Sequence, residues 1–497
     1  MKMKVKELLP GLFRFEDTCN VYVVRNDEGC IAVDFGSGAW LDAHAKLGLP
    51  PIEKVLLTHH HADQCSGLLK KRSWPFEIQA PAGERDWLEP EGVANFWKNH
   101  RRGGVPSSYS VLSRGLHSVQ YNMAGFGDIT WRGRRLRFLE TPGHGRGAIT
   151  LVCNLDGKQV AFCGDAAYAG AKVWQPYHLE WDHWTGSGAI AAFEGITCLS
   201  GPRIDLLCPS HGPVVSEKPR AMLKQLAGKL LRFYEAKGSI CPNEPDRYLC
   251  VRDLDIRVQE VLPGVFHFGG NGYLLLSKSG EALAFDPTVG DLPALDQLLE
   301  HLGQPKITEA TATHYHIDHS DGLPILKKRF RTRIVLHPRV AAPIRKLGAI
   351  DCPWLPPKAI KADELMPETG AWRWNEFRFR VAPFPGQTWW HAAFMAEIDG
   401  KKVCFSGDNY QPSTRWNGTG GFSSFNGSRF IEGFVASSKT ILKWNPDLVL
   451  NGHNTQVRYA PSYYRKVISW AEKSEKATRA LCPSDDLDQD YYLHPAK

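Results

Sequence analysis

The sequence has no long apolar run and no disulfide pattern, and both absences limit the class of protein. No stretch among its 497 residues approaches the roughly 20 consecutive apolar residues that span a bilayer. The N-terminal stretch MKMKVKELLPGLF lacks the apolar segment of a secretory signal, so we expect a cytoplasmic protein with no membrane partner. The 12 cysteines show no CxxC pair and no disulfide spacing, which predicts reduced and mostly buried thiols.

The chain also lacks a large excess of one sign of charge, because 60 basic and 53 acidic residues give a formal net charge of only +7. The basic residues form short clusters at 70–72 and 327–333, which a solvated surface explains better than a nucleic-acid-binding stripe does. The sequence therefore argues against a nucleic-acid partner. With 43% hydrophobic and 23% charged residues, the composition is typical of a folded globular protein.

The chain repeats itself once along nearly its whole length. THHHADQCSGL at 58–68 returns as THYHIDHSDGL at 313–323, and VKELLPGLFRF near the start returns as VQEVLPGVFHF. Further matched pairs follow in the same order, namely TPGHG and FPGQT, FCGDAAY and FSGDNYQ, and CPSHG and LNGHN. We therefore predict two tandem domains, 1–249 and 250–497, which also accounts for the length.

Within each copy, β-rich runs such as CIAVDFG and EKVLLTHHH alternate with helical segments such as AMLKQLAGKLL. This alternation predicts an α/β fold class. Nearly every histidine or aspartate of interest follows directly after a β-rich run, where loops carry chemistry in such folds.

The second copy carries a loop that is chemically suited to bind two divalent ions side by side. His314 and His316 can serve one ion, while Asp318 and His319 serve its neighbour. Imidazole and carboxylate are ligands that zinc and other borderline metals accept, and a partly filled coordination sphere leaves room for water.

Both copies resemble the metallo-β-lactamase fold, and the loop is similar to that of glyoxalase II. In that family an HxHxDH loop, a histidine after a Pro-Gly turn, an aspartate in a GD turn and a final histidine surround one or two metals. The resemblance spans both copies. It implies a four-layer αββα sandwich in each, with the metals at one edge between the sheets.

For the first copy the resemblance implies three histidines for one ion, an aspartate and a histidine for a second ion, and a bridging aspartate. In that order these are His59, His61, His144, Asp63, His211 and Asp165. Gln64 stands where the family has a further histidine for the second ion. Because an amide oxygen is a weaker donor for zinc than imidazole, we expect the first copy to be mononuclear.

For the second copy the resemblance implies two histidines for one ion, three ligands for the other, and one bridge. In that order these are His314, His316, Asp318, His319, His453 and Asp408. Gln387 replaces the histidine of the Pro-Gly turn. Four residues later, His391 is a candidate for the missing ligand, and the alternative is a surface or supporting role. If His391 coordinates, we expect the second copy to hold two ions.

Several neighbouring residues receive other roles. We expect His60 to lie outside the ligand set, Asp34 and Asp286 to secure the loops by hydrogen bonds, and Cys65 to be incidental. Aromatic residues after the GD turns either line an apolar cleft or belong to the core and the domain interface. These are Trp174, Tyr177, Trp181, Trp184, Trp389, Trp390, Trp416, Phe422 and Phe425.

The resemblance implies a metal-dependent hydrolase that uses a metal-bound hydroxide on a small ester, thioester, lactone or amide. Zinc is the expected ion, one or two per domain, with iron or manganese as alternatives. Asp63 and Asp318 are the catalytic candidates, because each can both bind metal and orient the attacking water. A non-haem iron oxidoreductase, a metal-dependent nuclease and a scaffold role for one copy stay open. Neither the substrate nor the oligomeric state follows from the sequence.

Overall fold

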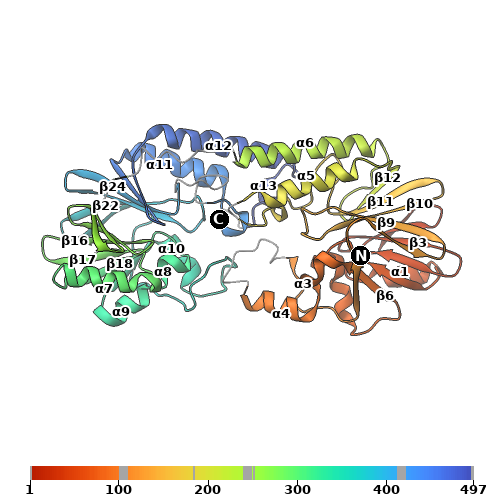
Figure 1. Ribbon diagram of the computed structural model, residues 1–497, viewed down its shortest axis with the longest axis horizontal. Helices are drawn as coiled ribbons and strands as arrows, with labels where there is room; N and C mark the ends of the chain where they lie inside the picture. Colours follow the sequence, from red (N-terminus) through yellow and green to blue (C-terminus); the bar gives the residue numbers. More distant parts are fainter. Residues whose placement is uncertain are drawn as a thin grey trace.

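Two β-sheets face each other in each half of the chain, and helices cover their outer faces (Figure 1). The sheets of the first half lie at one end of the molecule and those of the second half at the other (Figure 1). The computed structural model describes residues 3–99, 110–182, 185–238, 249, 252–410 and 421–493.

The described part of the first half forms one seven-stranded and one five-stranded sheet. The larger sheet comprises β1 (Lys4–Leu9), β2 (Leu12–Glu16), β3 (Asn20–Arg25), β4 (Cys30–Val33), β5 (Ile52–Leu56), β6 (Glu77–Pro81) and β7 (Val119–Met123). The smaller comprises β8 (Gly127–Trp131), β9 (Arg134–Glu140), β10 (Ile149–Leu155), β11 (Lys158–Gly164) and β12 (Leu206–Pro209). The larger sheet follows chain order and is parallel from β4 onward. In the smaller sheet β12 is added beside β11 in parallel.

The described part of the second half repeats this plan with eight and six strands. The larger sheet comprises β13 (Arg252–Ile256), β14 (Val258–Leu262), β15 (Val265–Phe268), β16 (Gly272–Leu276), β17 (Glu281–Phe285), β18 (Lys306–Thr311), β19 (Arg333–Leu336) and β20 (Glu364–Leu365). The smaller comprises β21 (Gly370–Trp374), β22 (Phe377–Pro383), β23 (Ala392–Ile398), β24 (Lys401–Gly407), β25 (Leu448–Asn451) and β26 (Thr455–Arg458). Both sheets follow chain order, with β24 and β25 paired in parallel.

The helices differ in length, and the long ones lie on the smaller sheets. In the first half they are α1 (Trp40–Lys46), α2 (Ala62–Cys65), α3 (Arg85–Leu88), α4 (Pro90–Asn99), α5 (Ser187–Leu199) and α6 (Pro219–Gly238). In the second half they are α7 (Leu292–His301), α8 (Ile317–Ser320), α9 (Leu323–Phe330), α10 (Pro338–Ile344), α11 (Ala436–Trp444), α12 (Pro461–Arg479) and α13 (Leu487–Asp490). Short 3₁₀ or π turns include η4 (Pro176–Leu179), η7 (Ser424–Asn426) and η8 (Phe430–Val435).

Strand alternation gives each sheet two apolar faces, and this produces the layers. In the first half Leu12 of β2 and Phe138 of β9 share a core between the two sheets. Phe13, the next residue along, points to the other face and packs with Trp40 of α1. Behind the smaller sheet, Leu223 of α6 belongs to a third apolar cluster that includes residues of β10 and β11. The order of layers is helix, sheet, sheet, helix, so the predicted αββα sandwich is confirmed.

The division at 249/250 stays a prediction, because residues 239–248, 250 and 251 lie outside the described residues. Leu249 itself donates its backbone N–H to Gln456 of β26 at 3.0 Å, so it already contacts the second half. No helix among the described residues combines the length and the apolar character that crossing a membrane requires.

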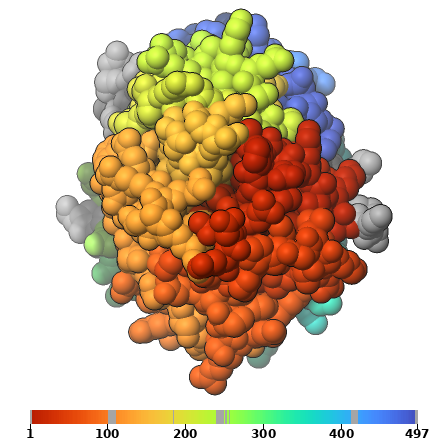
Figure 2. All heavy atoms as spheres, turned by 90° about the vertical axis from the view of Figure 1, so that its right-hand side faces the viewer, coloured from red at the N-terminus to blue at the C-terminus, as the bar shows by residue number. Residues whose placement is uncertain are grey.

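The two halves meet along their long helices. α6 packs on α12 near the middle of the molecule (Figure 1). Figure 2, which looks onto the first half, has α6 at its top with the C-terminal residues beside it. Trp470 donates its indole N–H to the carbonyl of Lys237 at 2.9 Å, and Ser474 donates to the carbonyl of Ala236 at 3.1 Å. Both carbonyls lie in the last turn of α6, where no later residue of the helix can donate an N–H to them.

A buried ion pair lies at this junction. Lys237 donates to Glu180 at 2.6 Å and to the hydroxyl of Tyr491 at 3.0 Å, and the Lys237 and Glu180 side chains are only 1% and 3% exposed. The second oxygen of Glu180 accepts from both the amide (2.8 Å) and the hydroxyl (2.7 Å) of Ser424. Burial lowers the pKa of Lys237, and Glu180 opposes that shift. Since Tyr491 and Ser424 belong to the second half, the pair joins the halves.

Removal of one charge from this pair is expected to destabilise the packed halves strongly, because the other charge stays buried without its counterion. For Lys237→Met we expect a loss of about 3–5 kcal/mol in the free energy of unfolding, measured by chemical denaturation. Lys172→Met is the matched control: Lys172 also bridges the halves, to Asp485 at 2.7 Å, but Asp485 is 68% exposed. That change should cost about 1 kcal/mol or less. Equal losses from the two variants would contradict the structural importance of the buried pair.

Candidate metal centres

Each candidate metal loop follows a strand that ends between the two sheets of its half. In the first half the loop lies between β5 and α2, and Asp34, just after β4, secures it. Asp34 accepts hydrogen bonds from the Thr58 amide at 2.8 Å and from the Thr58 hydroxyl at 3.0 Å. In the second half Asp286 accepts from the amide and hydroxyl of Thr313 at 2.6 and 2.8 Å. Both aspartates therefore act on the loops through hydrogen bonds, as the sequence predicts.

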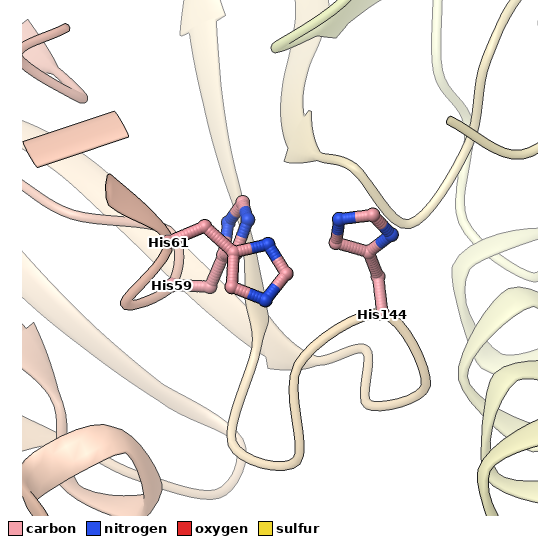
Figure 3. Close-up of side chains that lie close together, drawn as sticks. All are labelled: His59, His61 and His144. Atoms are coloured by element: carbon pink, nitrogen blue, oxygen red, sulfur yellow. The ribbon is translucent and has the colours of Figure 1, made fainter. Parts of the chain in front are cut away.

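His59, His61 and His144 form a compact group that we call the three-histidine cluster. One ring nitrogen of each lies within 4.8 Å of the others, and all three side chains are buried. Figure 3 shows that His59 and His61 come from one loop and His144 from another. Burial lowers the pKa of all three, well below the usual range for His61 and His144. Neutral imidazoles are the form that binds metal, so the cluster fits a divalent ion.

A glycine directs Asp165, the predicted bridging aspartate of the first half, toward this cluster. Gly164 at the end of β11 has φ +55°, and a Cβ there would lie 2.8 Å from the hydroxyl of Thr58. The chain can therefore turn sharply and run close to the loop only without a side chain at this position. Asp165 follows, and its Oδ2 lies 3.6 Å from Nε2 of both His59 and His144.

A second group in the first half consists of Asp63, Asp165 and His211. His211 Nδ1 lies 2.8 Å from Asp165, and its Nε2 lies 3.2 Å from Asp63. Burial alone would lower the pKa of His211, but the two carboxylates outweigh it and raise the value to about 10. Gln64, where the family has a histidine, donates its amide N–H to Asp165 Oδ2 at 3.1 Å. The Asp165 carboxylate thus keeps a donor on the side where the family has a histidine.

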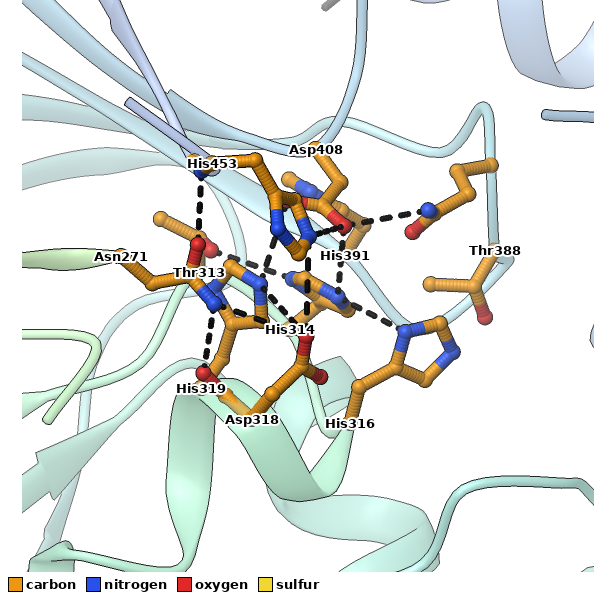
Figure 4. Close-up of polar contacts among 12 residues, drawn as sticks. Asn271, Thr313, His314, His316, Asp318, His319, Thr388, His391, Asp408 and His453 are labelled. Carbon is orange, nitrogen blue, oxygen red and sulfur yellow. Dashed lines mark hydrogen bonds and ion pairs between the residues drawn. The ribbon is translucent and has the colours of Figure 1, made fainter. Parts of the chain in front are cut away.

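In the second half the candidate ligands gather around Asp408, which follows β24 (Figure 4). Two overlapping groups have suitably close donor atoms: His314, His319 and Asp408, and Asp318, His319 and His453. The two oxygens of Asp408 each lie 3.1 Å from a ring nitrogen, one of His319 and the other of His453. His319 and Asp408 are buried, whereas the side chains of Asp318 and His453 are 43% and 41% exposed.

The charges of this cluster support one another. Burial would raise the pKa of Asp408, but His453 and His319 outweigh it and hold the value well below the usual range. Burial would lower the pKa of His319, but the carboxylates around it, Asp408 first, raise it well above its ordinary value. Protonated imidazole can therefore neutralise the buried carboxylate, and a divalent cation can supply the same positive charge.

His316 and His391 lie beside these groups. His316 Nδ1 is 3.0 Å from His314 Nε2, so the two loop histidines can still face one ion. The ring of His391 stacks on that of His314 at 4.8 Å, and its Nδ1 lies 3.1 Å from the carbonyl of Ala392. Gln387 donates to Asp408 Oδ2 at 3.1 Å, as Gln64 does to its own aspartate. Coordination by His391 stays a prediction, and the close donor groups do not include it.

The remaining loop residues have structural partners. The ring of His60 contacts the buried carboxylate of Glu84 through Nδ1 and stacks on Trp87 at 5.2 Å. Its centroid lies 4.6 Å from that of His61, but the close donor group does not include it. Cys65 is buried, and burial raises the pKa of its thiol well above the usual range. A thiol in that state is a poor nucleophile, which agrees with an incidental role.

The sequence pattern does not identify one histidine that lies near the metal groups. His178, on η4, has its ring centroid 4.2 Å from that of His61 and 4.6 Å from that of His144. It lies in the stretch YAGAKVWQPYHLEWDHW, where no metal-ligand spacing marks it. Only the fold, which turns this stretch back over the loop, brings it to the cluster.

The predicted aromatic walls divide into two groups. Trp174 stacks on His211 with ring centroids 4.4 Å apart, and Trp181 donates to the carbonyl of Gly143 at 2.9 Å, so both border the first-half site. Four of the others lie in or against the apolar cores of the second half, which supports the core interpretation for them. They are Tyr177, Trp389, Trp390 and Phe422. Phe425 is buried, and Trp184 and Trp416 lie outside the described residues.

Curated relatives match only part of this chain. A hydroxyacylglutathione hydrolase of Xylella fastidiosa (strain M23) is 30% identical over 151 residues, which are 30% of this chain and 44% of that protein. One of Aeromonas salmonicida (strain A449) is 27% identical over 160 residues, 30% of this chain and 47% of that protein. The chain therefore spans less than half the length of these relatives.

Similar solved structures include a subclass B3 metallo-beta-lactamase of Bradyrhizobium japonicum, 17% identical, covering 46% of this chain and 92% of that one at a TM-score of 0.36. An archaeal metallo-beta-lactamase superfamily protein from Sulfolobus tokodaii is 22% identical, covering 43% and 81% at a TM-score of 0.32. Scores this low carry no structural argument by themselves. The family model described as the metallo-beta-lactamase superfamily matches residues 14–211 and 267–428, which together make up most of the chain. By that match, and in agreement with the resemblance of both copies, the chain belongs to the metallo-beta-lactamase superfamily.

Proposed function

We propose that the protein is a metal-dependent hydrolase and that its reaction takes place in the second half. The observation that carries this proposal is the exposure of Asp318 and His453, at 43% and 41%, beside buried His319 and Asp408. An ion bound by these residues would be held by protein on its inner side and would face solvent on its outer side. A catalytic metal site needs such an open position.

The residues around this position have separate tasks. When bound, a divalent ion acidifies water and polarises the carbonyl under attack. Asp318 stands at the exposed side, where its carboxylate can bind the ion and also orient the attacking water. Asp408 lies behind, in contact with His319 and His453, and supplies negative charge that is fully shielded from solvent. Gln387 donates to Asp408 and holds its carboxylate in one orientation.

For the substrate we propose a small ester or thioester, with lactones and amides as further candidates. The relatives named hydroxyacylglutathione hydrolase support this class and make an acylated glutathione the first compound to test. The expected ion is zinc, and iron or manganese would redirect the substrate search. Small-molecule substrates also agree with the modest net charge of +7.

In the first half we propose one ion in the three-histidine cluster. His59, His61 and His144 offer neutral imidazoles there, while the neighbouring position around Asp63 has Gln64 in place of a further histidine. The two halves would then bind metal at different positions of the same fold. The first half keeps all ligands of the three-histidine position, and the second half keeps all ligands of the neighbouring position around its loop aspartate.

The metal content of the purified full chain tests this arrangement. We expect about two ions per chain, one in each half. His59→Ala/His61→Ala and Asp318→Ala/His453→Ala should each remove about one ion. His44→Ala is the control, because His44 is a buried imidazole that packs on Trp40 away from both sites. A double variant that keeps the full metal content would mean that its half holds no ion.

The two loop aspartates test where the reaction occurs. Asp318→Asn keeps the size of the side chain but removes the charge that binds the ion and orients water. We expect kcat/KM for thioester hydrolysis to fall by about 10²–10⁴-fold. Asp63→Asn is the matched change in the first half, and the two variants are compared under the same conditions. A larger loss from Asp63→Asn would mean that the first half carries the reaction.

Restoration of the family's histidine tests the role of Gln64. For Gln64→His we expect the metal content to rise by about one ion per chain, because Asp63 and His211 already flank that position. The new imidazole would find Asp34 nearby, as His319 contacts Asp286 at 3.2 Å in the second half. Gln64→Asn, which supplies no imidazole, is the control. An unchanged metal content in a folded Gln64→His protein would contradict this reading of the first half.

A further inference from the structure

His178 packs against the three-histidine cluster of the first half. Its ring centroid lies 4.2 Å from that of His61 and 4.6 Å from that of His144, and those two rings are 4.7 Å apart. The side chain of His178 is 2% exposed. His60 is a fifth buried imidazole here, with its ring 4.6 Å from that of His61, but its Nδ1 contacts Glu84. The close donor group comprises His59, His61 and His144, so a ring nitrogen of His178 has to move toward that group to join it.

One ring nitrogen of His178 is held, and the other lacks a partner. Nε2 lies 3.0 Å from the hydroxyl of Ser110, while buried Nδ1 has no hydrogen-bond partner among the described residues. The same holds within those residues for Nε2 of His59, His60 and His61 and for Nδ1 of His144. Ligating histidines commonly use their second nitrogen to contact a neighbouring group. Donation from Nε2 to Ser110 would leave on Nδ1 the lone pair that a metal requires.

Contacts with the second half fix the position of His178. Gln175, just before η4, adopts a left-handed conformation with φ +46° and reverses the chain. Tyr177 then packs in an apolar core of the second half, and Glu180 accepts two hydrogen bonds from Ser424. The residues on both sides of His178 are thus bound to the second half, so this ring is presented to the first-half cluster by the domain interface.

The matching segment of the second half presents an amide at the equivalent place. Asn426 lies after the GD turn of the second half as His178 does in the first, and its Oδ1 is 3.0 Å from Nε2 of His316. His316 is the counterpart of His61. In both halves this segment therefore contacts the second histidine of the HxHxD pattern, His61 or His316. Only the first half supplies an imidazole for that contact.

We propose that His178 is a fourth imidazole ligand of the ion in the first half, which rests on the proposed function in that this half holds an ion. Nδ1 of His178 turns toward the ion that His59, His61 and His144 bind. Four imidazoles fill the tetrahedral positions of a closed zinc site, so no position is left for water or substrate. Asp165 then pairs with His59 and His144 from outside the coordination sphere. The first-half ion is then structural, and hydrolysis is confined to the second half.

The full chain carrying Asp318→Ala/His453→Ala and loaded with Co(II) isolates the first-half site. In this background His178→Cys should give a thiolate-to-cobalt charge-transfer band in the near ultraviolet, which requires coordination by residue 178. His44→Cys places a cysteine at another buried histidine, outside both sites, and should give no such band. This readout does not depend on activity.

Azide supplies a second readout in the same background. With His178 present we expect the visible Co(II) spectrum to stay unchanged when azide is added, because no coordination position is open. His178→Ala should open a position, so azide should change the spectrum, and the Co(II) affinity should fall by about 10–100-fold.

Absence of the charge-transfer band in a Co(II)-loaded His178→Cys protein, together with an azide response while His178 is present, would overturn the proposal. Failure of the background protein to bind Co(II) at all would overturn both this inference and the first-half ion of the proposed function. Thioester hydrolysis by the unaltered chain would still stand in that case, so the two failures are distinguishable.

Discussion

The burial of one carboxylate between the two sheets of each half is the constraint around which both sites are organised. Asp165 and Asp408 are almost fully shielded from solvent, and an unpaired charge in that position costs several kcal/mol. Donors must therefore surround it. The loop histidines, the final histidine and a glutamine amide all approach it, from strands and turns that are far apart in the chain. The same demand for positive charge makes the position suitable for a metal cation.

This constraint explains why glutamine is tolerated where the family has histidine. Gln64 and Gln387 each donate an amide N–H at 3.1 Å to the buried aspartate of their half, Asp165 or Asp408. Each change therefore keeps the carboxylate satisfied, although it removes an imidazole that would bind metal. The changes fall at different positions of the pattern. The first half therefore keeps its three-histidine cluster, and the second half keeps the neighbouring group of Asp318, His319 and His453. Loss of a ligand does not entail loss of the fold.

The sequence was sufficient for the repeat and for the candidate ligands of the HxHxD loops, because both are local patterns. The layered architecture followed from the resemblance to the family, since strand alternation alone does not specify it. The sequence was insufficient wherever the geometry depends on long-range packing. The place of His391 depends on how β23 begins beside the loop of His314, and its ring stacks there instead of joining the close donor groups. His178 depends on a turn held by the other half. No spacing along the chain encodes either arrangement.

Exposure distinguishes the two sites more clearly than their ligand types do. The three-histidine cluster is buried beneath a turn whose flanking residues, Tyr177 and Glu180, are held by the second half. The Lys237–Glu180 pair stabilises that turn, so the interface between the halves also determines what can reach the first-half cluster. The second-half cluster has no comparable cover over Asp318 and His453 in the described residues. Under the proposed function, a tandem arrangement in which one domain helps to close the other would direct small substrates to the site that stays open.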